Sequence, residues 1–256
     1  MNHNNGDVPL IRVGTAMCGH AAGAYRLITK LRESLTKYGL TANIDEVGCL
    51  GICYAEPLID IKKADHARLF FNNVQPEDAD HIIEKYLLKN EIPQEKVLGY
   101  EGDEGSVTGE PPLSSIPGIR LQNRIALRNA GHIAPSDIFQ YIAKGGYGGL
   151  HKAITNMKSS EVIEEVKNSG LRGRGGAAFP TGVKWSFLVS SPGPTKYILC
   201  NCEEGDPGAY NDKGILESDP HTLLEGLAIA GYATGATNGI VFIRHGHDVA
   251  INRTEK

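Results

Sequence analysis

A segment rich in proline, glycine and acidic residues, at positions 93–120, divides this chain of 256 residues. Such a composition buries too little apolar surface to fold by itself, so it predicts a linker. The chain is long enough to form a separate core on each side of that linker. We therefore expect one domain at residues 10–92 and another at residues 121–256, after a disordered polar tail at residues 1–9.

Both predicted domains have the alternating pattern of α/β proteins. Short apolar runs predict strands, and apolar residues at helical spacing predict helices that pack on the resulting sheets. In the first domain, strands are expected at residues 10–13, 42–47, 58–61 and 68–71, and helices at residues 24–38 and from Pro76 onward. In the second domain, helices are expected at residues 135–143, 160–169 and from Pro220 onward, and strands at residues 196–201 and 239–244.

The composition excludes several classes of function. The net charge is −4 and no basic stripe stands out, which argues against a nucleic-acid-binding protein. No apolar run approaches the roughly 20 residues of a membrane span, and the start lacks the pattern of a secretory signal. Five cysteines, in a chain too long to need a disulfide scaffold, favour a reducing cytoplasm and thiols free for metal or redox chemistry.

Three of the cysteines follow the first two strands of the first domain. Cys18 comes after the first strand, and Cys49 and Cys53 form a C-x3-C pair after the second. Loops after adjacent strands often meet at one end of a sheet, so the three thiols are expected to converge there and to hold an iron–sulfur cluster. The alternative is that they are small buried hydrophobic residues.

The second domain contains a glycine- and arginine-rich segment at residues 170–187. Glycines allow the backbone to approach a ligand closely, and they leave N–H groups that can face anionic oxygens. Arg172, Arg174 and Lys184 add positive charge, and aromatic residues add flat apolar faces. A nucleotide fits this combination, whereas the alternative is a solvated loop. The glycine spacing is not the G-x-G-x-x-G of a Rossmann fold.

An acidic turn at residues 201–208 follows a predicted strand of the same domain. Open α/β sheets bind ligands at the carboxyl ends of their strands. Asn201 can hydrogen-bond the edge of a heterocycle. Glu203, Glu204 and Asp206 could contact ribose hydroxyls or repel anions. A solvated acidic turn is the alternative, but the neighbouring glycine-rich segment favours a ligand site.

These segments together resemble a known family. Residues 121–244, with the string Gly-Arg-Gly-Gly-x-x-Phe-Pro-Thr-Gly-x-Lys-Trp, are similar to the flavin- and NADH-binding subunit of respiratory complex I and of soluble NAD-linked hydrogenases and formate dehydrogenases. Residues 10–90 resemble the thioredoxin-like 2Fe–2S ferredoxin domain that the soluble relatives carry at their amino terminus. The resemblance implies an α/β fold, with a thioredoxin-like ferredoxin domain followed by the first part of an FMN-binding domain.

The resemblance also implies a function. In that family NADH passes hydride to FMN, and electrons continue singly to iron–sulfur clusters, so an electron-transfer subunit of an NADH dehydrogenase is expected. The chemistry belongs to the cofactors, and no side chain is expected to act as a catalytic acid, base or nucleophile. The implied partners are NADH and the other subunits of a hydrogenase, formate dehydrogenase or complex I-like assembly. The acidic turn is expected to disfavour the 2′-phosphate of NADPH.

The site residues follow from the same resemblance. Those expected around the FMN phosphate and the dinucleotide are Gly173, Arg174, Gly175, Gly176, Ala177 and Lys184. Those expected to stack on the adenine of NADH are Phe179 and Phe187. Those expected to face the flavin ring are Asn201, Glu203 and Glu204, and Asp206 is expected at the nicotinamide end.

Two departures from the family qualify these expectations. The family's ferredoxin domain has a C-x4-C pair, but the positions five residues before and after Cys18 are Val13 and Gly23. Either His20 is the fourth ligand, or the domain has lost its cluster and serves for docking. The family also continues with a second flavin-contacting segment and a 4Fe–4S domain, which predicts that this chain is a fragment or a natural short form. The alternative function is therefore a non-catalytic docking or electron-transfer module with an incomplete flavin site.

Overall fold

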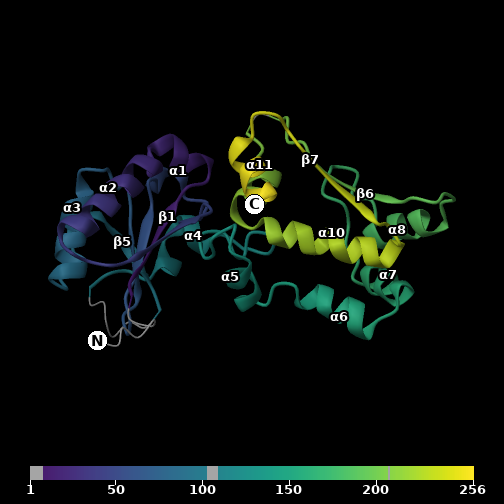
Figure 1. Cartoon of the computed structure of the whole chain (residues 1–256), viewed down its shortest axis with the longest axis horizontal. Helices are drawn as coiled ribbons and strands as arrows, with labels where there is room; N and C mark the ends of the chain where they lie inside the picture. The colour runs from purple at the N-terminus through teal and green to yellow at the C-terminus, as the bar shows by residue number, and fades with distance from the viewer. Residues whose placement is uncertain (1–7, 103–108, 207) are drawn as a thin grey trace. The chain divides into compact units, whose positions relative to one another are not determined.

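The computed structural model describes residues 8–102, 109–206 and 208–256. The chain divides into two compact units, residues 1–135 (unit 1) and residues 136–256 (unit 2) (Figure 1). Among the described helices, none is long and apolar enough to cross a membrane.

Unit 1 is built on a mixed sheet with the strand order β2-β1-β3-β4-β5. Its strands are β1 (Leu10–Gly14), β2 (Asn43–Val47), β3 (Ile59–Lys62), β4 (Arg68–Phe71) and β5 (Val97–Glu101). β1 and β2 are parallel, whereas the pairs β1–β3, β3–β4 and β4–β5 are antiparallel. A parallel β-α-β crossover followed by an antiparallel β-β-α element is the thioredoxin-like arrangement, which confirms the predicted fold class.

The predicted linker is in part a folded portion of unit 1. Its first residues form a 3-10 turn, η3 (Gln94–Lys96), and the edge strand β5. Its last residues form the short helices η5 (Leu113–Ser115) and α4 (Pro117–Arg120). The centre of the predicted linker, residues 103–108, and most of the predicted tail, residues 1–7, lie outside the described residues. Neighbouring glycines and prolines favour an irregular segment, and for this reason the sequence pattern does not predict β5.

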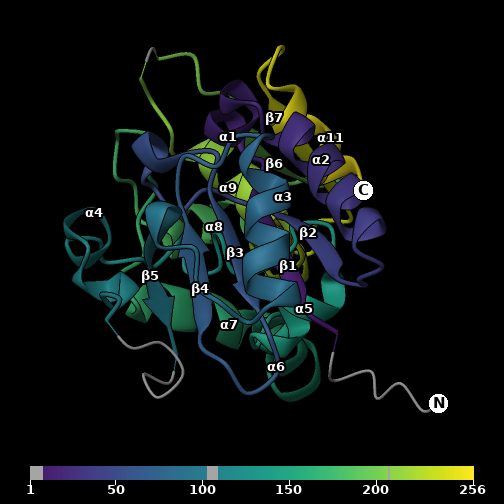
Figure 2. The same cartoon turned by 90° about the vertical axis from the view of Figure 1, so that its left-hand side faces the viewer.

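Apolar side chains on one face of this sheet form the larger core of unit 1. Helices α2 (Ala24–Lys37) and α3 (Asp78–Ile82) pack on that face, and a π-helical turn, η2 (Ile83–Leu88), continues α3 (Figure 2). Strand residues alternate between the two faces, so every second residue enters this core. The buried strand residues in it are Ile11, Val13, Ile59, Ile61, Leu69 and Phe71, each at most 1% exposed, and Tyr100, which is 5% exposed.

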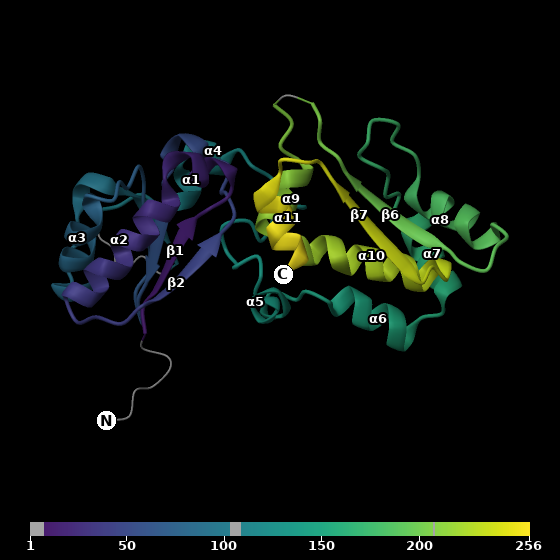
Figure 3. The same cartoon turned by 45° about the horizontal axis from the view of Figure 1, so that its top comes forward.

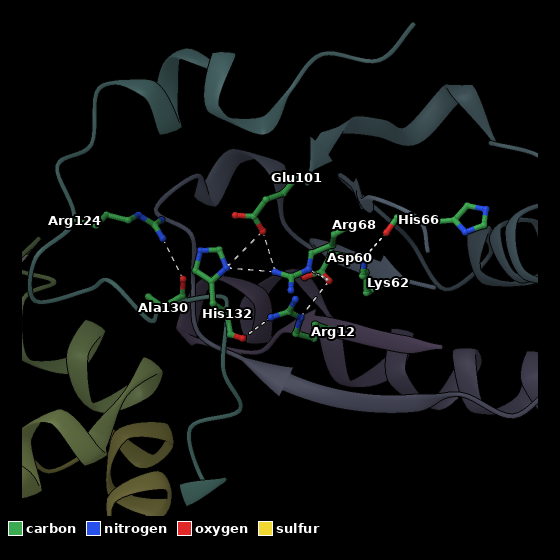
Figure 4. Close-up of polar contacts among 9 residues, drawn as sticks. All are labelled: Arg12, Asp60, Lys62, His66, Arg68, Glu101, Arg124, Ala130 and His132. Carbon is green, nitrogen blue, oxygen red and sulfur yellow. Dashed lines mark hydrogen bonds and ion pairs between the residues drawn. The ribbon is translucent and has the colours of Figure 1, made fainter. Parts of the chain in front are cut away.

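The opposite face of the same sheet carries charged residues that the chain after β5 covers. Arg12 and Asp60 are only 2% and 3% exposed, and Arg12 Nε lies 3.2 Å from Asp60 Oδ1. Arg68 Nε lies 3.4 Å from the same carboxylate oxygen, and Arg12 Nη1 donates a hydrogen bond to the carbonyl of His132 (Figure 4). A second, smaller core packs beside these charges. It contains Leu50, Ile52, Ala55, Leu58, Phe70 and Leu113.

Unit 2 contains a parallel strand pair, β6 (Tyr197–Cys202) and β7 (Asn238–Ile243), with helix α10 (Pro220–Thr234) packed on one face (Figure 3). The other face of the pair is exposed and apolar. It presents Tyr197, Leu199, Ile240 and Phe242, which are between 47% and 63% exposed. The remaining helices are α5 (Ile138–Ala143), α6 (Gly148–Asn156), α7 (Ser159–Asn168), α8 (Thr181–Ser190), α9 (Asp212–Ser218) and α11 (Asp248–Glu255).

Glu225 of α10 holds the start of α6 and the end of α5. Its carboxylate accepts hydrogen bonds from the backbone N–H groups of Tyr147 (2.9 Å) and Leu150 (3.1 Å) and from the hydroxyl of Tyr141. Burial alone would raise the pKa of Glu225, but these donors outweigh burial and the pKa lies below its usual value. Glu225 therefore stabilises unit 2 in its ionised form.

We expect Glu225→Gln to lower the free energy of unfolding of unit 2 by about 1–3 kcal/mol, because an amide nitrogen would face N–H donors. A carboxyl with a depressed folded-state pKa stabilises the fold above its unfolded-state pKa, and this contribution is lost as pH falls through the folded-state pKa. The deficit of the variant should therefore shrink in acid. Urea unfolding at several pH values, followed by the fluorescence of Trp185, the single tryptophan, measures the free energy of unfolding of unit 2.

The matched control is Glu165→Gln, because Glu165 and its partner Lys152 are 63% and 59% exposed at their side chains. That pair should contribute less than about 1 kcal/mol. Equal unfolding midpoints for Glu225→Gln and the control at pH 7 would contradict the assigned role.

Candidate functional site

The three predicted cysteine ligands lie together in unit 1. Cys18 lies in the short helix α1 (Met17–Ala22) after β1, Cys49 follows β2, and Cys53 begins the 3-10 turn η1 (Cys53–Ala55). The Sγ atoms of Cys18 and Cys53 are 2.7 Å apart, and those of Cys49 and Cys53 are 3.9 Å apart. All three Sγ atoms lie within 4.8 Å of one another. The predicted convergence of the thiols is thus what the structure shows.

Among the described residues, no further histidine, cysteine or carboxylate lies within 4.8 Å of all three Sγ atoms. His20, considered as the fourth ligand, is exposed and lies edge-on against Tyr25, with ring centroids 5.2 Å apart. Val13 is fully buried in the sheet core, and Gly23 is the left-handed cap of α1. The structure therefore does not bring any of these three positions into the thiol group.

Tight backbone packing fixes the position of Cys18. A Cβ atom on the next residue, Gly19, would overlap the carbonyl oxygen of Gly14, so α1 lies directly against the end of β1. In the facing loop, the backbone N–H of Gly51 donates to the Sγ atom of Cys49 at 3.2 Å. N–H groups directed at sulfur are typical of loops that hold metal-bound thiolates.

Burial strongly disfavours thiolates at this site in the absence of a cation. Desolvation, with Cys53 and Glu56 as neighbours, raises the pKa of Cys18 to about 12, and burial also raises the pKa of Cys49. Glu56 lies buried beside them, and burial raises its pKa to about 7. A thiophilic metal supplies the missing positive charge and takes thiolates as ligands, so the donor set fits a thiolate-bound metal centre. Glu56 was not among the residues predicted at this site.

In unit 2, the glycine-rich segment forms a narrow loop that leads into α8. The backbone N–H of Gly173 donates to the carbonyl of Phe179, and that of Thr181 donates to the carbonyl of Leu171, both at 2.9 Å. The side chain of Arg172 closes the loop by donating to the carbonyl of Ala178 at 3.0 Å. The residues exposed at the tip of the loop are Arg174, Gly175, Gly176 and Ala177.

Positive charge and aromatic rings gather at the start of α8. Lys184 is exposed in the first turns of this helix, whose amino-terminal end favours anions. The rings of Phe179 and Phe187 lie 6.1 Å apart and are 41% and 60% exposed. These groups present a surface with the features that a phosphate-bearing aromatic ligand requires. Their assignment to FMN and NADH stays a prediction.

The acidic turn lies at the carboxyl end of the parallel pair, where β6 and β7 both end. Glu203 pairs there with Arg244 at 2.7 Å, and the side chain of Asn201 accepts the N–H of Glu203 at 3.1 Å. Asp206 is exposed. Arg244 was not among the predicted site residues, although it is the last residue of the predicted strand at residues 239–244 and directly follows β7.

Glu204 has a structural role within the described residues. It is 8% exposed, and its carboxylate accepts the backbone N–H groups at the start of α9, those of Asn211, Asp212 and Lys213. Burial would raise the pKa of Glu204, but these donors lower it below its usual value. The carboxylate of Glu204 therefore stabilises the start of α9, and its predicted place facing the flavin stays a prediction.

The loop, the helix start and the acidic edge lie within a part of the chain that matches a known family model. Residues 166–256 match the family model of the Nuo51 FMN-binding domain, so this part of unit 2 is homologous to that domain and the predicted resemblance is confirmed.

Curated relatives match over about half of the chain. The NADP-reducing hydrogenase subunit HndC of Solidesulfovibrio fructosivorans is 52% identical over 137 residues, which are 54% of this chain and 28% of the relative. A second relative, part of an NADH-quinone oxidoreductase of Rhizobium meliloti, is 47% identical over 136 residues, which are 52% of this chain and 31% of the relative. The chain thus spans less than a third of the length of these relatives.

A solved structure also resembles part of the chain. The thioredoxin-like 2Fe–2S ferredoxin from Aquifex aeolicus aligns with 39% of this chain and 97% of its own, at 19% identity and a TM-score of 0.33.

Proposed function

We propose that this chain is an electron-transfer component of a flavin-dependent NADH oxidoreductase. The observation that carries the proposal is the match of residues 166–256 to an FMN-binding domain. The relatives are named as subunits of a hydrogenase and of NADH-quinone oxidoreductases, and we extend that role to this chain in a cytoplasmic assembly. The three-thiol group in unit 1 supports a second redox centre in the same chain.

The residues of unit 2 would divide the work of binding. The loop at residues 171–181 and Lys184 would hold the FMN phosphate, because the loop has an exposed glycine-rich tip and Lys184 is an exposed cation in the helix that follows it. Phe179 and Phe187 would stack on the adenine of the dinucleotide. Bound FMN would accept two electrons as a hydride and release them one at a time.

In unit 1, the three thiols would hold a 2Fe–2S cluster as thiolates. The site provides three protein sulfur ligands within reach of one another. A 2Fe–2S cluster usually has four ligands, so the fourth ligand would be a group other than these three thiols.

The test is flavin binding by the chain, followed by quenching of FMN fluorescence. We expect Lys184→Ala and Arg174→Ala to weaken FMN binding by about 10-fold to 100-fold, since each removes a charge-assisted contact to phosphate. Lys152→Ala is the matched control, because this exposed lysine pairs with Glu165 on the surface. Wild-type affinity in both loop variants would contradict the assigned phosphate site.

The choice of dinucleotide is tested separately, by reduction of ferricyanide with NADH or NADPH. We propose NADH, since the exposed Asp206 adds negative charge to the acidic turn, which would receive the ribose. One of the relatives is named for NADP reduction, so the comparison discriminates between two real alternatives.

The second candidate is a docking or electron-transfer module whose flavin site is inert. The observation that favours it is that Glu203 and Glu204 are both engaged within unit 2, by Arg244 and by the start of α9. A chain with a folded circular dichroism spectrum that fails to bind FMN in excess would establish this alternative.

A further inference from the structure

We propose that Arg124 is a positioning residue for the cysteine centre of unit 1. Its guanidinium fixes the loop at residues 49–53 that carries two of the three thiols, and its charge favours the more negative, reduced state of a cluster held there. The proposal rests on the proposed function, because it concerns the cluster that unit 1 is proposed to hold.

Arg124 joins the cysteine loop to the segment after α4 through three donors. Its Nη2 donates to the carbonyl of Leu50, the residue after Cys49. Its Nη1 donates to the carbonyl of Ala130 at 3.1 Å (Figure 4), and its Nε donates to Gln122 Oε1 at 2.9 Å. A planar guanidinium can bridge three acceptors at once in this way, whereas a lysine ammonium has no such fixed geometry.

Gln122 strengthens the same connection. Its Nε2 donates to the carbonyl of Leu50 at 3.1 Å, so two side chains hold one carbonyl next to Cys49. Leu50 is 2% exposed, and a Cβ atom on Gly131 would overlap its side chain. The cysteine loop is therefore packed directly against the segment at residues 118–131.

The residues at the end of that segment and directly after it are anchored to the sheet. Arg12 of β1 donates to the carbonyl of His132, and Arg68 Nη1 lies 3.4 Å from His132 Nδ1 (Figure 4). Ala130 and Ile133 are at most 1% exposed. Arg124 thus connects the cysteine loop to a fixed part of unit 1, and a fixed support is what a positioning residue needs.

The charge of Arg124 acts on the thiols from a partly buried position. Arg124 lines a cavity of about 320 Å³ together with Leu50, Gln122 and His132. Burial lowers the pKa of Arg124, while the negative form of Cys49 raises it. A guanidinium keeps its proton at neutral pH in any protein environment. A fixed positive charge near thiolates favours the added electron of a reduced cluster.

The experiment uses the full chain, reconstituted anaerobically with iron and sulfide and titrated with dithionite. We expect Arg124→Gln to shift the reduction equilibrium of the centre about 10-fold toward the oxidised form. For a one-electron couple, this shift makes the midpoint potential more negative by about 59 mV. We also expect faster loss of iron to a chelator. Arg124→Lys should keep a midpoint close to wild type, because it keeps the charge, but should lose iron as fast as Arg124→Gln.

Arg120→Gln is the matched control, since it removes an exposed arginine from the preceding helix α4. It should leave both readouts unchanged. An unchanged midpoint and an unchanged rate of iron loss in Arg124→Gln would overturn the proposal, and so would equal effects in the control. A wild-type chain that takes up no iron would overturn the proposed function of unit 1 instead, so the two failures are distinguishable. Far-UV circular dichroism of each variant shows whether the fold persists.

Discussion

Replacing Asp60 with alanine is expected to lower the free energy of unfolding of unit 1 by about 3–5 kcal/mol. The Asp60 carboxylate lies 3.2 Å from Arg12 Nε and 3.4 Å from Arg68 Nε. The side chains of Asp60 and Arg12 are only 4% and 2% exposed. The substitution therefore leaves a guanidinium buried without its counter-charge, which costs far more than the ion pair itself contributes.

Hydrogen–deuterium exchange of the amides in β1 and β3 measures this effect, because it separates unit 1 from unit 2. The unfolding of unit 2, followed by Trp185 fluorescence, should be unchanged and serves as an internal reference. Glu33→Ala is the control variant: Lys30 and Glu33 form an exposed pair, at 38% and 61%, which should be worth less than about 1 kcal/mol. A loss below about 1 kcal/mol for Asp60→Ala would show that the buried pair is dispensable.

The second large effect is expected at the cysteine centre. Cys49→Ser should reduce the iron bound after anaerobic reconstitution to less than about a tenth of the wild-type amount, because serine offers no thiolate for iron. The Sγ atom of Cys49 lies 3.9 Å from that of Cys53 and accepts the backbone N–H of Gly51. Colorimetric iron and sulfide analysis of the purified chain checks the result.

Cys200→Ser is the matched control for that experiment. Cys200 is in β6 of unit 2, where its Sγ atom lies 3.6 Å from that of Cys202, outside the three-thiol group. It should retain the wild-type iron content. Undiminished iron in Cys49→Ser would mean that the metal is bound elsewhere in the chain.

The strands and longer helices could be predicted from the sequence because their signals are local. The predicted strand at residues 68–71 coincides with β4, and the predicted start at Pro220 is the start of α10. The side chain of Asp219 accepts the N–H of Thr222 there, as a helix-capping residue should. The three thiols also converge as predicted, since the ends of neighbouring parallel strands must lie side by side.

The covered charged face of unit 1 could not be predicted in the same way. The alternation of Arg12 with Ile11 and Val13 predicts an ordinary strand that has one buried face and one face exposed to water. Only the chain after β5 makes that face an interior, and its glycines and prolines predicted a linker. Arg124 shows the same difficulty: nothing local to its sequence indicates that it would meet Leu50, 74 residues earlier. Contacts of this range are a property of topology rather than of pattern.

The exposed face of the strand pair in unit 2 has a consequence for handling the protein. Tyr197 and Leu199 of β6 lie beside Ile240 and Phe242 of β7, all at least 47% exposed. Parallel strands are normally covered on both faces, and an uncovered apolar face promotes association with other chains. The segments that define the sheet of unit 2 are therefore also its main aggregation liability.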